Sequence, residues 1–157
     1  MKSNLHVLRF VVLGILGCFG IVTSQPLAAQ AQSVSTLTIR VAGPRNAKGQ
    51  IGVALFRDAA GFPSDSSKAF RTQQAKIDPQ TLTAEVVFEA IPRGVYAVSV
   101  FHDENLNGKL DKTSVGIPKE GYGAANNPRK RVGPPPFDEA KFTLGQPQQV
   151  VEIKLIY

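Results

Sequence analysis

The stretch that decides the fold is VYAVSVFH, residues 95–102, which carries apolar side chains at both alternating sets of positions. Successive side chains of a strand point to opposite faces of its sheet, so this pattern is typical of a central strand that is covered on both sides. The stretch runs directly into DENLNGKLD, residues 103–111, where oxygen-bearing side chains recur at every second position before Gly108. The sequence therefore predicts a buried strand that leads into a loop rich in oxygen ligands.

Other stretches on both sides of this one also show strand patterns, in which apolar side chains alternate with polar or small ones. The glycine-containing turn at residues 43–49 joins the first two and predicts that they form an antiparallel hairpin. Helix signals are weak, and residues 64–70 predict at most one or two helical turns before Asp78-Pro79 breaks the chain. The strand-like stretches are residues 35–41, 51–55, 81–90, 140–144 and 150–157.

Residues 103–136 have little periodicity and many glycines and prolines, which predicts one long loop. Short strands separated by turn residues, with little helix, are typical of two packed antiparallel sheets. We therefore predict an all-β fold, an immunoglobulin-like or transthyretin-like antiparallel β-sandwich of about seven strands with one long loop. A partly open barrel would use the same strands, and periodicity does not separate the two.

The beginning of the chain has the layout of an export signal. Two basic residues precede the apolar run at residues 10–22, and Ala29-Gln30-Ala31 offers small side chains for cleavage. The apolar run is too short to cross a bilayer comfortably as a helix. We predict that residues 1–31 are removed and that residues 32–157 form a single domain in the periplasm or outside the cell.

Cys18, the only cysteine in the chain, allows a different fate. The run ILGC at residues 15–18 resembles a lipobox, in which the cysteine is acylated and anchors a lipoprotein. Cleavage after Ala31 is favoured because the apolar run continues past Cys18. The mature protein would then have no disulfide, no thiolate nucleophile and no sulfur metal ligand.

The formal net charge is +6, and the only basic cluster is formed by Arg129, Lys130 and Arg131. A patch of this size on a proline-rich loop is usually a solvated surface. Together with the export signal, this argues against nucleic-acid binding. Weak contact between the cluster and an anionic envelope surface remains open, and the sequence predicts neither a specific partner nor an oligomeric state.

The loop at residues 103–111 has the ligand spacing of the twelve-position calcium loop, with Gly108 at the sharp turn. Position twelve holds Ser114 instead of a bidentate glutamate, so modest affinity is expected. The alternative is an ordinary turn capped by Asp103, with its acids solvated. The predicted Ca²⁺ ligands are the side chains of Asp103, Asn105, Asn107 and Asp111, the carbonyl of Lys109, and Glu120 as a further carboxylate.

His102 lies beside Asp103, which suggests a general base with an orienting acid. Adjacent strand residues face opposite ways, so a histidine that hydrogen-bonds the long loop is the favoured interpretation. A metal-assisted hydrolase that acts on an envelope substrate would need His102, Asp103 and Glu120 to converge in one pocket. The sequence thus favours a non-enzymatic binding or interaction module, with the hydrolase and a purely structural envelope domain as alternatives.

Six runs of the chain carry a family resemblance: IPRGVYAV at 91–98, HDEN at 102–105, NGKLD at 107–111, GIPKEGYG at 116–123, NN at 126–127 and FDEA at 137–140. They closely resemble the bacterial family called domain of unknown function 2141, and the resemblance covers residues 37–157. It implies a small exported protein of Gram-negative bacteria and no established activity, substrate or ligand. It also implies that residues 116–127 belong as one unit with the loop at residues 103–111, the candidate cation loop.

Overall fold

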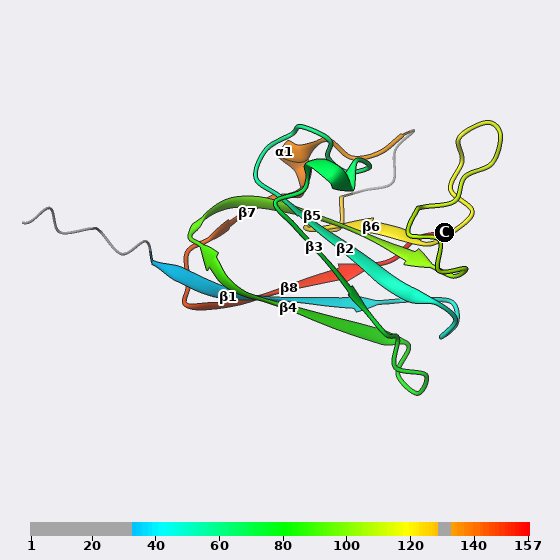
Figure 1. Ribbon diagram of the computed structural model, residues 1–157, viewed down its shortest axis with the longest axis horizontal. Helices are drawn as coiled ribbons and strands as arrows, with labels where there is room; N and C mark the ends of the chain where they lie inside the picture. The colour runs from blue at the N-terminus through cyan, green and yellow to red at the C-terminus, as the bar shows by residue number, and fades with distance from the viewer. Residues whose placement is uncertain (1–32, 129–132) are drawn as a thin grey trace, which may run out of the picture. The chain divides into compact units, whose positions relative to one another are not determined.

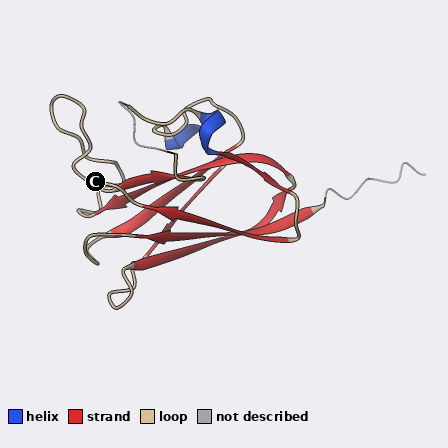
Figure 2. Cartoon of the chain, turned by 180° about the vertical axis from the view of Figure 1, so that it is seen from behind, coloured by secondary structure: helices blue, strands red, loops and turns tan. Residues whose placement is uncertain are grey.

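The computed structural model describes residues 33–128 and 133–157, which form two packed β-sheets with little helix (Figure 1, Figure 2). The predicted all-β sandwich is confirmed. Within the described part of the chain, no helix is long and apolar enough to cross a membrane. The elements are β1 (Val34–Ala42), β2 (Gln50–Phe56), the 3-10 helix η1 (Ser66–Lys68), β3 (Arg71–Ala75), β4 (Thr83–Pro92), β5 (Gly94–Asp103), β6 (Tyr122–Ala124), α1 (Phe137–Ala140), β7 (Lys141–Leu144) and β8 (Gln148–Lys154).

One sheet has the strand order β4-β1-β8, and the other has the order β3-β2-β5-β6, with β7 also paired to β5. The core lies between the two layers and is built from alternate side chains of each strand. Leu37, Ile39 and Val41 of β1 are at most 1% exposed, and Ile51 and Leu55 of β2 are fully buried in the same cluster. The predicted inward faces of these two strands are therefore correct.

The predicted hairpin between the first two strands is wrong. β1 pairs with β4 and β8, whereas β2 pairs with β3 and β5 in the other sheet. Both strands bury one apolar face in the shared core, and they do so from opposite layers. A turn between two alternating stretches does not distinguish this crossing from a hairpin, because both arrangements bury the same side chains.

The prediction that all strands are antiparallel fails at one ladder, because β8 runs parallel to β1 with Ile39 opposite Val151. Side chains alternate with a period of two in parallel and in antiparallel strands, so the sequence pattern does not distinguish the two kinds of pairing. Two strands were also missed. β3 is a polar strand exposed at four of its five residues, and β6 lies inside the stretch predicted to be a loop.

β5 is a central strand covered on both faces, as its sequence predicts. Tyr96 and Val98 enter the core between the sheets. On the other face, Ala97 packs in a second apolar cluster with Phe62 and Phe137, which come from the β2–β3 connection and from α1. Because both faces are covered, the side chains at the end of β5 are buried where the strand joins the loop that starts at residue 104.

Candidate cation loop and its anchoring network

Asp103, the last residue of β5, closes the cation loop from inside. Its side chain is fully buried, and Oδ1 accepts the backbone N–H of Asn107 at 3.0 Å. Oδ2 accepts the N–H of Gly108 at 2.9 Å and the side-chain amide of Gln50 at 3.1 Å. A buried carboxylate is tolerated when its oxygens receive several hydrogen bonds, so these three donors explain why Asp103 can lie at the base of the loop.

Two asparagine side chains of the loop meet the carboxylate of Asp111. Asn105 Nδ2 donates to Asp111 Oδ2 at 2.8 Å, and Asn107 Nδ2 donates to Asp111 Oδ1 at 3.0 Å. The carbonyl oxygens of the two carboxamides accept backbone N–H groups, from Asn107 and from Lys109. The predicted side chains of the second half of the loop are thus brought together around one carboxylate.

Glu120 fastens the far end of the long connection between β5 and β6, residues 104–121, to this loop. The residue is 4% exposed, Oε1 accepts the N–H of Glu104 at 2.9 Å, and Oε2 accepts the N–H of Asp111 at 2.9 Å. The Lys119 N–H also donates to the carbonyl of Asp111 at 2.8 Å. Both Glu120 oxygens are engaged with the backbone, which gives this carboxylate a bracing role in the structure.

The donor set is compatible with a hard cation and unsuited to zinc. Within the described residues, no group of three or more His, Cys, Asp or Glu side chains is placed to hold a metal ion. The loop instead carries the carboxylates of Asp103 and Asp111 and the carboxamides of Asn105 and Asn107, whose nitrogens face Asp111 and whose oxygens accept backbone N–H groups. Calcium accepts such mixed oxygen shells at loosely set angles, whereas zinc prefers nitrogen and sulfur ligands.

His102 is a fully buried structural residue. Its Nε2 lies 2.7 Å from the carbonyl oxygen of Lys48 and therefore donates to it. Nδ1 lies 2.7 Å from the hydroxyl of Tyr157, which itself accepts the N–H of Arg45 at 2.8 Å. The backbone N–H of His102 reaches the long connection through the Gly121 carbonyl. Both ring nitrogens are occupied by these partners, so the ring hydrogen-bonds neither Asp103 nor Glu120.

Glu104 points away from the cation loop toward Arg45, whose Nε lies 2.7 Å from Oε1. Burial acts to raise the pKa of the Glu104 carboxyl, but hydrogen bonds from Arg45 and Asn46 outweigh it and lower the pKa below its ordinary value. The hydrogen bond to Glu104 raises the pKa of Arg45, and burial raises the pKa of the Tyr157 hydroxyl. The arginine also stacks on the Tyr157 ring, 4.8 Å from its centroid.

Sequence reasoning missed this network because Arg45, Lys48 and Tyr157 lie far from His102 along the chain. The available signal was the glycine at position 49. Its φ is +70°, and a Cβ there would come within 1.9 Å of the Asp103 carbonyl oxygen. A left-handed glycine in close contact with another segment indicates that two distant stretches cross.

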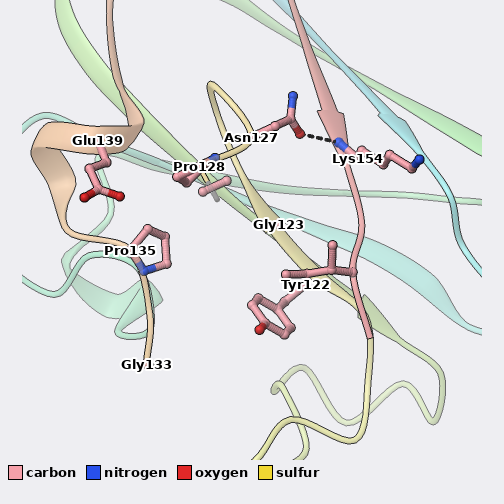
Figure 3. A pocket seen from close by; sticks show the side chains of 10 residues that line it. Tyr122, Gly123, Asn127, Pro128, Gly133, Pro135, Glu139 and Lys154 are labelled. Carbon is pink, nitrogen blue, oxygen red and sulfur yellow. Dashed lines mark hydrogen bonds between the residues drawn. The ribbon is translucent and has the colours of Figure 1, made fainter. Parts of the chain in front are cut away.

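A cavity of about 150 Å³ lies outside this network, between β6, the end of β8 and the segment before α1 (Figure 3). Tyr122, Gly123, Pro135 and Ile156 are among its lining residues, and none of the predicted ligands is. Asn127 Oδ1 accepts the N–H of Lys154 at its edge. The predicted basic cluster of Arg129, Lys130 and Arg131 lies outside the described residues, as do Cys18 and Ala31.

A family model described as an uncharacterized protein conserved in bacteria, DUF2141, matches residues 39–152. The chain belongs to this family. The resemblance of the sequence to domain of unknown function 2141 is thereby confirmed, and the match runs from β1 to β8 through the whole cation loop. No curated protein and no solved structure matches the chain. The family description assigns no activity.

Proposed function

We propose that this protein is an exported, non-enzymatic binding or interaction module whose long connection is ordered by calcium. The observation that carries the proposal is the meeting of Asn105 and Asn107 with the Asp111 carboxylate, in a loop closed from inside by Asp103. Export rests on the signal-like layout of residues 1–31.

Calcium binding would reuse these side chains. Asp103 and Asp111 would supply the two negative charges, and the carboxamide oxygens of Asn105 and Asn107 and the Lys109 carbonyl would complete most of the shell. The ion has to compete with the two Nδ2 groups that now donate to Asp111. Two carboxylates and this competition favour weak binding, with a dissociation constant of about 0.1–1 mM, the range of extracellular calcium modules.

The hydrolase alternative has no geometric support. His102 is fully buried, with both ring nitrogens in hydrogen bonds to groups other than Asp103 and Glu120. A general base must reach the proton that it abstracts, and a ring enclosed in this way presents no free nitrogen to a substrate. A binding or interaction role, in which the loop is a surface rather than a reaction centre, is therefore preferred.

The test is a calorimetric titration of the metal-stripped protein with calcium, combined with thermal melts. A ligand that binds only the folded state stabilises it by about 1.4 kcal/mol at ten times its dissociation constant, which corresponds to roughly 5 °C in a domain of this size. The Asp111→Asn variant should lose both the heat and the shift, because one of the two charges is removed.

The matched control is Glu89→Gln, which removes one exposed negative charge from β4, away from the loop, and should leave the calcium response intact. A wild-type protein that gives no heat and no rise in melting temperature at millimolar calcium would refute the calcium part of the proposal. In that case a purely structural envelope domain becomes the better interpretation.

A further inference from the structure

The segment at residues 104–119 projects beyond the strands of the sandwich (Figure 1, Figure 2). It carries three large aliphatic side chains that do not pack on the domain. Leu106 is 63% exposed, Val115 is 78% exposed and Ile117 is 62% exposed. Single exposed apolar residues are common, and three on one projecting segment make this segment a candidate contact surface.

These side chains are held outward by hydrogen-bonded turns. The Thr113 N–H donates to the Ile117 carbonyl at 2.7 Å, and the Gly116 N–H donates to the Thr113 carbonyl at 2.9 Å. Leu106 has a φ of +62°, which bulky residues rarely adopt and which asparagine or glycine would adopt at less cost. The segment therefore presents its aliphatic side chains from defined turns.

The charge on this surface is predominantly positive. Lys109, Lys112 and Lys119 are exposed, and none of them forms an ion pair with the described residues. Of the two acids in the same segment, Glu104 pairs with Arg45, which leaves Asp111, the acceptor of the Asn105 and Asn107 amides, against the three lysines. The surface thus combines aliphatic side chains with unpaired ammonium groups.

We propose that Leu106, Val115 and Ile117 insert into the surface of a bilayer that contains anionic phospholipids, with the lysines at the headgroup phosphates. A protruding segment of this chemistry suits a fluid interface, where aliphatic groups enter the acyl boundary and lysines remain with the phosphates. Phospholipid is favoured over a protein partner because the aliphatic side chains protrude from turns and the lysines complement an anionic headgroup layer. The contact does not require calcium, because the side chains are exposed without it.

The experiment is co-sedimentation of the purified protein with phosphatidylcholine vesicles that contain or lack phosphatidylglycerol, in calcium and in chelator. The wild type should sediment with the anionic vesicles both in calcium and in chelator, and it should be released by high salt. A Leu106→Asn, Val115→Thr, Ile117→Thr variant should bind at least tenfold more weakly. A Lys112→Gln, Lys119→Gln variant should bind about 30-fold more weakly, since each lysine near an anionic surface contributes about fivefold to the affinity.

Two control variants separate this surface from others. Val87→Thr, Val95→Thr, Val150→Thr changes three exposed strand valines and should bind like the wild type. Substitution of Arg129, Lys130 and Arg131 by glutamine should also leave most of the binding intact. Thermal melts report on folding, and a calcium titration of the aliphatic variant keeps a failure here distinguishable from a failure of the calcium proposal.

Three results would overturn the proposal. One is no binding of the wild type to anionic vesicles in chelator, and another is equal binding to pure phosphatidylcholine. The third is unchanged binding of both loop variants, including the case in which only the substitutions at residues 129–131 abolish binding.

Discussion

Two left-handed glycines of the site region, Gly49 and Gly108, have similar φ values of +70° and +75° but different surroundings. A Cβ at position 49 would collide with the Asp103 carbonyl oxygen, whereas one at position 108 would meet nothing within 4 Å. Gly108→Ala should therefore lower the free energy of unfolding by only about 1–2 kcal/mol, the penalty for alanine in a left-handed backbone conformation. Gly49→Ala should lower it by about 2–5 kcal/mol, because overpacking is added to that penalty. Urea unfolding of both variants measures the difference, and equal losses would show that the crossing at Gly49 is not tight.

At the residue scale, the spacing of side chains along the chain was enough to predict part of the loop geometry. The predicted ligands lie close together in the chain, at Asp103, Asn105, Asn107 and Asp111. Their spacing and the glycine at position 108 therefore already predict that they share one loop. The partners of His102 were not predictable in this way. Tyr157 reaches its ring from the end of the chain, and an alternating apolar strand gives no indication of where a terminal side chain will find a partner.

At the scale of elements, Glu120 joins the two halves of the β5–β6 connection. Replacement by glutamine keeps one acceptor oxygen, but its amide group would face a backbone N–H of Glu104 or Asp111. Glu120→Gln should cost about 1–3 kcal/mol of stability, because one buried donor loses its acceptor. Hydrogen exchange should accelerate at the Glu104 or Asp111 amide while the β1 amides stay protected.

The Glu89→Gln variant again serves as the control, since it removes a charge from an exposed strand position without touching the connection. Unchanged exchange at both amides in Glu120→Gln would contradict the bracing role of this carboxylate.

The elements that sequence reasoning missed share a physical cause. β3 has four exposed residues and no apolar alternation, so the strand is set by its pairing with β2 rather than by its own pattern. β6 is three residues long, too short for any periodicity, and is placed by Phe101 opposite Tyr122. Strands with a buried face were predictable, and strands defined only by a neighbour were not.

At the scale of the whole molecule, the export proposal concerns the residues ahead of β1, which begins at Val34. Cleavage after Ala31 would leave all eight described strands in the mature chain. We expect the intact mass of the processed protein to correspond to a chain that starts at Gln32, and Cys18→Ser to leave processing unchanged. A mature chain that starts at a lipid-modified Cys18, with Cys18→Ser blocking its maturation, would instead establish the lipoprotein alternative.

The parallel pairing of β1 with β8 has a consequence for the order of folding. Paired residues such as Ile39 and Val151 are more than one hundred positions apart, so the ladder forms only after a long loop has closed. During synthesis the amino end of the chain emerges first, so this sheet cannot be completed until β8 has also emerged. Until then one edge of β1 is unpaired, and an emerging chain would be exposed to aggregation at that edge. Completion of the β4-β1-β8 sheet is therefore a late event that follows the emergence of β8.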